Sequence, residues 1–548
     1  MIVSKGFDFR FLTLLPLLAS VLLGSHWARA ADKPKVRQPG VAGSFYPADP
    51  KELAKMVDGF LAQANPPAIK GPLVALVAPH AGYPFSGPVA AYSYALLRTR
   101  KFARVVVIAP SHYEAFPFNS IYDGDAYATP LGQVPVDKAF AAKLVAMSPL
   151  IKFSGQGHGE VQGRWEHALE DELPFLQRVL GQFSLVPVVM GDQDYGTSRA
   201  LGVSLARLIE KEGRAGGTAD GDYNTLIVAS SDMSHYHTYD EAEIMDHKTL
   251  NAIEEWDYFN LSLNSEQRVW EACGGGGIVA AMIAAERLGA NRAIVLQYAN
   301  SGDVTPDKSR VVGYGAEALV REAAAHGAKV AEFKPEFKLD AKEKQALMTI
   351  ARNSVESFVR QGKLYECSPG GMEALARDRG AFVTLKEHGD LRGCIGYITP
   401  LKPLCMTVRD VAALAAVRDP RFTPVSASEL NELEYEISVL SPLRRVTDWK
   451  QIEVGRDGLL VREGNSQGVL LPQVASEEHW DRTTFLDQTC VKAGLPRHCW
   501  QNEDTDVFQF SAVVFGHPRA PEAAMPDQPA IPGATDTQVR PAPGSPPH

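Results

Sequence analysis

Cysteine is scarce in this 548-residue sequence, which contains only six. Cys273 is the only one before residue 360, and no two are spaced as C-x-x-C. The five later cysteines permit disulfides in an oxidising compartment, but their pairing cannot be read from the sequence and an odd number leaves one unpaired. The phosphate-binding pattern G-x-x-x-x-G-K-[ST] is also missing, so the sequence does not predict a nucleotide site.

A concentrated basic surface is missing too. The formal net charge is −10 and the sequence pI is about 5.8. Binding to nucleic acid requires clustered basic residues that neutralise phosphates, so we expect no nucleic-acid partner. The chain is 45% hydrophobic and 22% charged, which is ordinary for a globular protein, and it is long enough for two or more domains.

The amino terminus resembles a targeting signal. Basic residues precede the apolar stretch from Phe11 to Leu23, and the small residues Ala28 and Ala30 follow it. This stretch is shorter than the roughly 20 residues of a membrane-spanning helix. We therefore interpret residues 1–30 as a cleaved signal peptide rather than an anchor. The chain is expected to be exported, periplasmic or secreted, with no membrane span after cleavage.

Three apolar runs each lead into a turn that carries a histidine. His80 follows LVALVAP, His112 follows VVVIAPS and His235 follows LIVASSDMS. Such runs predict buried strands, and in open α/β sheets ligands gather beyond the carboxyl ends of the strands. Cys273 precedes a glycine run and a helical apolar pattern, and a helix amino terminus favours the metal-binding thiolate. These side chains together predict a metal site.

Each of these residues also has a plainer interpretation. A single histidine after a strand is often only a hydrogen-bonded loop residue, and a free cysteine is often a small core residue. His235 stands in SSDMSHY, where Asp232 could orient its imidazole. We therefore expect His235 to act as an acid or base near neutral pH, with Asp232 as its supporting residue.

The pattern of elements divides the chain into two domains. Strand and helix signals alternate over residues 36–325, which predicts an α/β domain with a largely parallel sheet. Residues 326–340 lose this alternation and are interpreted as a linker. Residues 341–518 mix helices and extended segments without alternation, which favours an α+β domain. Residues 519–548 are rich in proline and lack aromatic residues, so this tail is expected to be disordered.

Several motifs of the first domain resemble the Memo family, also called AmmeMemoRadiSam system protein B. They are APHAGYPFSG from Ala78, APSHY from Ala109, EHALEDELPFL from Glu166, SSDMSHY from Ser230 and NSGD from Asn300. The second domain similarly resembles the AMMECR domain, or AmmeMemoRadiSam system protein A, through LRGCIGYITP from Leu391 and DPRFTPV from Asp419. The system also names a radical SAM protein. The C-x-x-x-C-x-x-C cluster motif is missing here, so any such protein would be a separate partner.

The Memo resemblance implies a fold like that of the class III extradiol ring-cleaving dioxygenases. It implies a metal bound by His80, His112 and Cys273, with His235 as the acid/base histidine. The cysteine stands where those enzymes have a carboxylate. Fe(II) is the expected metal because three facial ligands leave positions for substrate and oxygen, whereas the thiolate also admits Cu(I) or zinc.

These expectations leave different classes of function open. The first is a metal-dependent, dioxygenase-like oxidoreductase. The second is a non-catalytic scaffold that holds a metal, a small molecule or a peptide. A zinc-dependent hydrolase is a third possibility, because three protein ligands and a water also suit zinc.

The segment WEHALEDELPFLQRVL has a helical pattern and offers two candidate supporting residues. His167 and Glu170 are three residues apart, so a helix would place both on one face. There they would either orient a metal ligand or face solvent.

The second domain offers weaker candidates. Arg392 and Cys394 belong to LRGCIG, and Arg421 belongs to DPRFTPV. A strand followed by a turn could present Arg392 to an anionic group. The plainer interpretation is a tight structural turn with a buried thiol.

Overall fold

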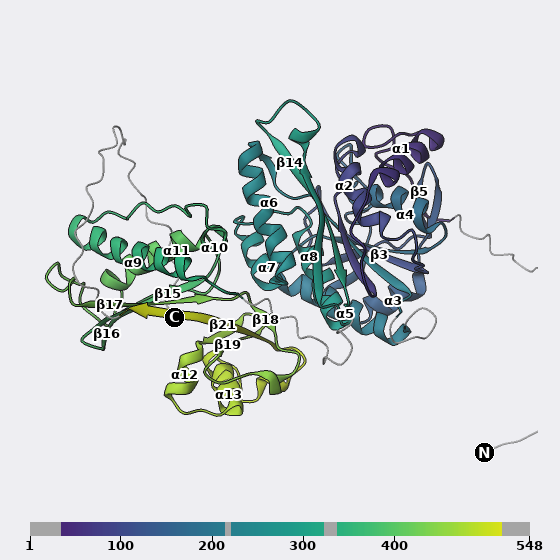
Figure 1. Ribbon diagram of the computed structural model, residues 1–548. Coiled ribbons are helices and arrows are strands. Elements are labelled where there is room, and N and C mark those ends of the chain that lie inside the picture. The colour runs from purple at the N-terminus through teal and green to yellow at the C-terminus, as the bar shows by residue number, and fades with distance from the viewer. Residues whose placement is uncertain (1–33, 214–220, 323–336, 518–548) are drawn as a thin grey trace, which may run out of the picture.

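The computed structural model describes residues 34–213, 221–322 and 337–517, which form two domains lying side by side (Figure 1). The predicted signal peptide at 1–30, the tail at 519–548 and most of the predicted linker at 326–340 lie outside the described residues. Within the described part of the chain, no helix is both long enough and apolar enough to cross a membrane.

A nine-stranded mixed sheet forms the centre of the first domain. Its strand order is β12 (His235–His237), β14 (Val311–Val320), β2 (Leu73–Ala78), β11 (Thr225–Ser230), β3 (Arg104–Pro110), β10 (Ser184–Met190), β4 (Asn119–Ile121) and β7 (Ile151–Phe153), with β13 (Arg292–Asn300) paired to β14. The central strands β2, β11, β3 and β10 are parallel, as predicted. Strands β14 and β4 pair antiparallel with β2 and β10, so the parallel character is limited to the centre.

Helices cover both faces of this sheet because its central strands are apolar on both sides. The domain contains α1 (Pro50–Gln63), α2 (Tyr83–Ala95), α3 (Lys138–Val145), α4 (Leu173–Leu180), α5 (Tyr195–Glu212), α6 (Tyr239–Glu254), α7 (Tyr258–Glu266) and α8 (Gly275–Arg287). One core lies between the sheet and α3, α5, α7 and α8, and a second lies between the sheet and α1, α2 and α4. A small sheet of β1 (Val36–Arg37), β5 (Ala126–Thr129) and β6 (Gly132–Pro135) and a hairpin of β8 (Glu160–Val161) and β9 (Arg164–Trp165) complete the domain.

The second domain is built on an antiparallel sheet. Its order is β16 (Asp390–Tyr397), β15 (Ala381–Glu387), β17 (Leu433–Leu440), β21 (Asp506–His517), β19 (Asp457–Glu463) and β20 (Ser466–Leu470), with β18 (Arg444–Arg445) paired to β21. Helices α9 (Ala341–Gln361), α10 (Glu373–Ala376) and α11 (Leu404–Val417) pack on one half, and α12 (Pro472–Glu477) and α13 (Arg482–Lys492) on the other. This arrangement agrees with the predicted α+β class.

One pair of the later cysteines is bonded. Cys490 in α13 and Cys499 form a disulfide, and Cys367, Cys394 and Cys405 are free thiols.

The two domains share an apolar core. Phe259 in α7 packs against Phe508 in β21, with ring centroids 4.9 Å apart. Leu440, Leu460 and Phe510 of the second domain belong to the same buried cluster as α5 and α8 of the first. Burial of apolar surface from both sides therefore holds the domains together.

Candidate metal centre

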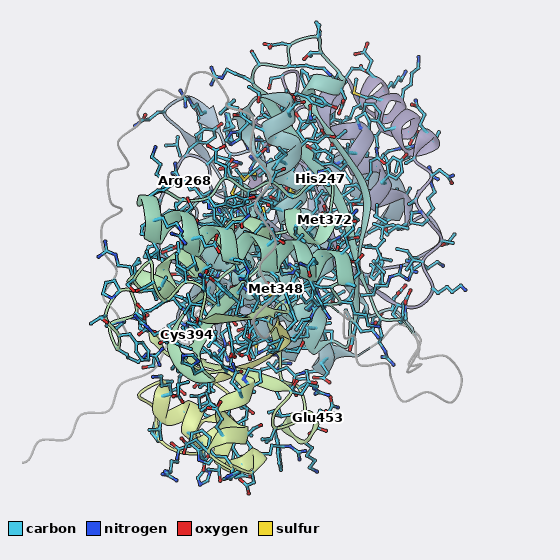
Figure 2. The ribbon with its side chains drawn as sticks, turned by 60° about the vertical axis from the view of Figure 1, so that its left-hand side comes forward. His247, Arg268, Met348, Met372, Cys394 and Glu453 are labelled. Atoms are coloured by element: carbon cyan, nitrogen blue, oxygen red, sulfur yellow. A yellow bond between two sulfur atoms is a disulfide. The ribbon has the colours of Figure 1, made fainter. Side chains whose placement is uncertain are left out.

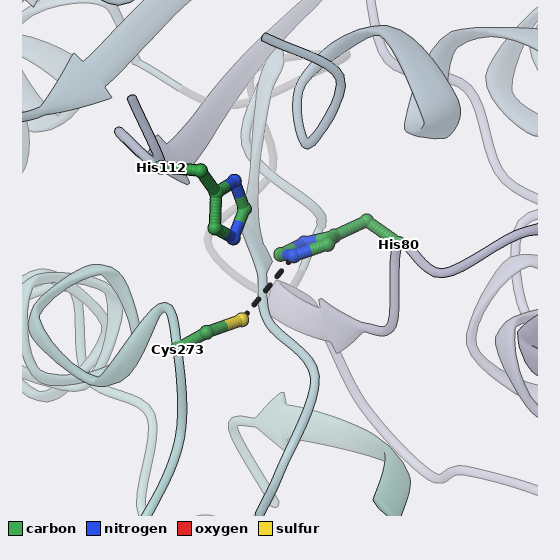
Figure 3. A group of neighbouring side chains, drawn as sticks. All are labelled: His80, His112 and Cys273. Carbon is green, nitrogen blue, oxygen red and sulfur yellow. Dashed lines mark hydrogen bonds between the residues drawn. The ribbon is translucent and has the colours of Figure 1, made fainter. Parts of the chain in front are cut away.

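Two imidazoles and one thiol converge at the carboxyl edge of the parallel strands. His80 follows β2, His112 follows β3, and Cys273 lies between α7 and α8. One donor atom from each lies within 4.8 Å of the others. The Sγ of Cys273 is 3.2 Å from Nε2 of His80 (Figure 3). The three residues predicted from the sequence as metal ligands therefore share one site.

The local backbone brings Cys273 close to the end of β11. Its N–H donates to the carbonyl of Asp232, and its Sγ accepts from the N–H of Asp232 at 3.2 Å. The next residue, Gly274, lies so close to the chain that a Cβ there would be 2.2 Å from the carbonyl oxygen of Ser230. Because Gly274 has no side chain, the start of α8 can lie close to the end of β11.

A buried hydrogen-bond network fixes the orientation of His80. The Oγ of Ser230 is 2.7 Å from Nδ1 of His80, 2.7 Å from the carbonyl oxygen of Ala168 and 2.6 Å from Oε1 of Glu172. Because a carbonyl can only accept, the hydroxyl of Ser230 donates to Ala168 and must accept from its other two neighbours. It follows that Nδ1 of His80 carries a hydrogen and that Glu172 is protonated.

The pKa values of these groups agree with that network. Burial raises the pKa of Glu172 to about 8, so this carboxyl group holds its proton near neutral pH. Burial and repulsion from His112, His167 and His235 hold the pKa of His80 well below its usual value. His80 is therefore a neutral imidazole whose Nε2 lone pair faces Cys273, which is the form that binds a metal.

Glu166 holds the second imidazole. Its Oε1 accepts from Nδ1 of His112 at 2.9 Å, and its Oε2 accepts from the N–H of the same residue at 2.6 Å. Burial lowers the pKa of His112, but hydrogen bonds to Cys273 and Glu166 outweigh burial and raise it to about 10. The carboxylate of Glu166 fixes Nδ1 and directs Nε2 into the cluster, an arrangement common among ligating histidines, and a metal ion would have to displace the proton that the raised pKa keeps on Nε2. The sequence reasoning missed Glu166, although it opens the quoted EHALEDELPFL motif.

His167 completes a cluster of imidazoles. Its ring stacks on His112 with centroids 4.8 Å apart and lies 5.6 Å from the ring of His80. Burial lowers its pKa to about 4, and its buried Nδ1 has no hydrogen-bond partner among the described residues. A buried polar atom without a partner is costly, so a group bound at this site would supply one. The donor set and this nitrogen together fit a bound metal.

The prediction that Glu170 shares a helix face with His167 is wrong. Its carboxylate binds the guanidinium of Arg37, the hydroxyl of Tyr46 and the N–H groups of Gly40 and Val41. The α-helix begins only at Leu173, because Pro174 is tolerated in a first turn but would break a helix that started at Trp165. Residues Glu170–Glu172 form a 3₁₀ turn instead, so the three-residue spacing does not place His167 and Glu170 on one face.

The third histidine lies near the same cluster. Nδ1 of His235 donates to the carbonyl oxygen of Met233 at 2.9 Å, which leaves its Nε2 unprotonated when the ring is neutral. The carboxylate of Asp232 accepts from the N–H groups of His80 and Ala81 and also interacts electrostatically with His235. Asp232 therefore supports the His80 turn, and burial raises its pKa to about 6.

Cys273 is a thiol when no metal is bound. Burial raises its pKa, and this effect exceeds the opposing hydrogen bond with His112. A metal ion would displace the thiol proton, because the thiolate is the form that ligates.

Two candidates of the second domain, Arg392 and Cys394, lie on β16, and Arg421 lies in the loop after α11; Cys394 is labelled in Figure 2. Asp419 accepts from the backbone N–H of Cys394 at 2.8 Å and forms a two-point ion pair with Arg421. Arg392 donates to Glu429 at 2.7 Å. Its guanidinium is therefore already paired with a carboxylate of the same domain.

The predicted turn at LRGCIG is wrong, because the motif lies within strand β16. Gly393 explains the glycine there: a Cβ on it would be 2.2 Å from the carbonyl oxygen of Ala415 in α11. The motif therefore lets a helix pack closely against the sheet.

The fold and the site define an α/β protein with a candidate metal centre at the ends of its parallel strands. The Memo-like protein family model matches residues 37–318, and the AMMECR1 model matches residues 348–515. The chain belongs to the Memo-like protein family and carries an AMMECR1 domain after its Memo-like domain, which confirms the resemblance noted in the sequence.

Individual proteins match the chain over part of its length. The MEMO1 family protein MK0963 of Methanopyrus kandleri is 37% identical over 293 residues, covering 51% of this chain and 97% of that protein. Protein TK0174 of Thermococcus kodakarensis is 44% identical over 192 residues, covering 33% and 94%. The crystal structure of the uncharacterized protein PH0010 from Pyrococcus horikoshii is 40% identical and covers 33% of this chain and 95% of that chain, with a TM-score of 0.31.

Proposed function

We propose that the Memo-like domain binds one metal ion through Nε2 of His80, Nε2 of His112 and Sγ of Cys273. The observation that carries this proposal is the convergence of these three donors, from distant parts of the chain, within 4.8 Å of one another. The hydrogen bonds of Ser230 and Glu166 support it, since each engages Nδ1 of one histidine and directs Nε2 of that ring toward the other donors.

Fe(II) is the proposed metal, with Cu(I) and zinc as alternatives. Two neutral imidazoles and a thiolate suit all three ions, and three ligands leave open positions. Bound Fe(II) would supply redox chemistry with oxygen. The proposed activity is that of an oxidoreductase related to the extradiol dioxygenases, in which His235 moves a proton through its Nε2.

A second candidate function is metal or peptide binding without turnover. The thiol of Cys273 supports this alternative, because a thiolate softens the site relative to a carboxylate and favours Cu(I) or zinc. A zinc-dependent hydrolase is the lesser alternative and also depends on the three donors.

Elemental analysis of protein purified under anaerobic conditions tests metal binding. We expect about one metal per chain in the wild type and loss of most of it in Cys273→Ser. Cys394→Ser is the matched control, because that half-buried thiol lies in the second domain. Equal metal content in the wild type and Cys273→Ser would remove Cys273 from the site.

Oxygen consumption with catechol-like substrates separates an enzyme from a scaffold. We expect uptake above background in the iron-loaded wild type and a strong decrease in His235→Ala at unchanged iron content. Background uptake in both proteins across a panel of catechols would favour the scaffold, and ester hydrolysis by the zinc form would favour the hydrolase.

We further propose that residues 1–30 direct export and that a separate radical SAM protein is a partner. The apolar stretch between Phe11 and Leu23 supports export, and the resemblance to the AmmeMemoRadiSam system supports the partner. Cell fractionation with mass spectrometry of the mature amino terminus tests the first, where cleavage after Ala30 is expected. Co-purification with the radical SAM protein tests the second.

A further inference from the structure

The AMMECR1 domain contacts the segment that carries Cys273. Nε1 of Trp270 donates to Oδ2 of Asp378 in the second domain at 3.0 Å. Asn264, near the end of α7, donates to the carbonyl oxygen of Pro400 at 3.0 Å. Trp270 and Asp378 are 4% and 5% exposed, so water competes little for the bond between them.

The same segment is anchored on the metal side. Cys273 follows Trp270 by three residues, and its carbonyl oxygen accepts from Nε2 of Gln193 at 2.8 Å. The carbonyl oxygen of Glu271 accepts from the hydroxyl of Thr249 at 3.1 Å. The short stretch between these anchors has little freedom, so a shift of Trp270 would be transmitted to the thiol.

Asp378 is itself held in place by contacts across the domain boundary. Lys248 of α6 lies 3.3 Å from its Oδ2. The flanking residues Arg377 and Arg379 both form ion pairs with Glu255, which follows the same helix. The second domain therefore presents a carboxylate of fixed position to the indole of Trp270.

We propose that Asp378 of the AMMECR1 domain is a positioning residue for the metal ligand Cys273, acting through Trp270. This inference rests on the proposed metal site and adds a role for the second domain. In this arrangement, the AMMECR1 domain completes the geometry of a site whose ligands all belong to the other domain.

The test uses the full chain, with cobalt(II) as the probe. Trp270→Phe removes the N–H donor and keeps an aromatic ring, and Asp378→Ala removes the acceptor. We expect each to weaken cobalt binding about tenfold and to diminish the cobalt–thiolate absorption band, as seen when partners of metal ligands are lost. The double variant should be no weaker than the single ones. Asp378→Asn keeps an acceptor oxygen and should restore most of the affinity.

A second readout does not depend on the metal. In metal-free protein, the alkylation rate of Cys273 by iodoacetamide, followed by mass spectrometry of its peptide, should increase in Trp270→Phe and in Asp378→Ala. Arg207→Ala is the matched control, since it breaks an exposed ion pair with Glu503 across the same domain boundary and should change neither readout. Thermal unfolding of each variant identifies any that are simply unfolded.

The outcomes are distinguishable. Wild-type affinity and alkylation rate in both variants, or an equal change in the Arg207→Ala control, would overturn the inference. If the wild type binds no cobalt or iron, the proposed function fails, and the alkylation rates alone then decide whether Asp378 positions Cys273.

Discussion

Nε2 of His80 lies 3.2 Å from Sγ of Cys273, although 193 positions separate the two residues in the sequence. One residue follows a central strand and the other precedes a helix, and both reach the same edge of the sheet. Every prediction about metal binding depends on this contact and on the groups that keep its nitrogen unprotonated.

Substitution by glutamine should affect metal affinity at Glu166 and stability at Glu170. Glu166→Gln loses the carboxylate that holds Nδ1 of His112, and we expect metal affinity to decrease by about 10- to 100-fold. Glu170→Gln should leave the affinity nearly unchanged, because its side chain binds Arg37. It should instead lower the free energy of unfolding by about 3 kcal/mol, since it leaves a buried charge without its partner. Isothermal titration with metal and chemical denaturation of both variants check this contrast, and the opposite pattern would contradict the assignment of Glu166.

The protonation state assigned to Glu172 can be tested by substitution. Glu172→Gln keeps a donor for Oγ of Ser230, so we expect metal affinity close to that of the wild type. Glu172→Met has a similar size but no donor, and it should weaken metal binding by about tenfold because the orientation of His80 is less defined. Equal affinities of the two variants, measured by competition with a chelator, would show that the network does not control His80.

The same residue should contribute to the pH dependence of stability. Its pKa is raised from 4.5 to about 8 in the folded chain, mainly by burial, so between these values the folded state holds a proton that the unfolded state has released. Its contribution to the free energy of unfolding should therefore fall as pH rises through this window, by up to about 1.4 kcal/mol per pH unit. Denaturation at a series of pH values should show a less negative slope in Glu172→Gln. An unchanged slope would mean that Glu172 is ionised in the folded protein.

The disulfide of the second domain should stabilise it. Cys490 and Cys499 are nine positions apart, and closing a loop of that length contributes about 2–3 kcal/mol in the chain-entropy description. We expect Cys490→Ser to lower the free energy of unfolding by about this amount and to leave metal affinity unchanged. Denaturation with and without a reducing agent measures the effect, and a reductant-insensitive wild type would show that the bond does not form.

The three donor residues could be predicted because their signal is local. Each histidine follows an apolar strand run, and Cys273 precedes a helix signal, so the common edge of a parallel sheet brings them together. The partners Glu166, Ser230 and Glu172 could not be identified in this way. Their roles depend on which side chains meet in the interior, and nothing in the sequence states those pairings.

The wrong prediction that Glu170 and His167 share a helix face came from overlooking Pro174. Pro174 lacks a backbone N–H and is suited to the first turn of a helix, so the helix had to begin near Leu173 rather than at Trp165. The mixed character of the sheet was harder to predict, because the runs that form β13 and β14 have the same apolar composition as parallel strands. Strand direction in this case is set by the connections between strands.

The aromatic contact between Phe259 and Phe508 affects whether the two domains can be prepared separately. Separating the two domains would expose apolar residues of this shared core on each fragment. Fragments with such exposed residues tend to associate nonspecifically, so truncated versions should precipitate or require a detergent even if each retains its internal hydrogen bonds. In this chain, each domain therefore covers apolar surface of the other.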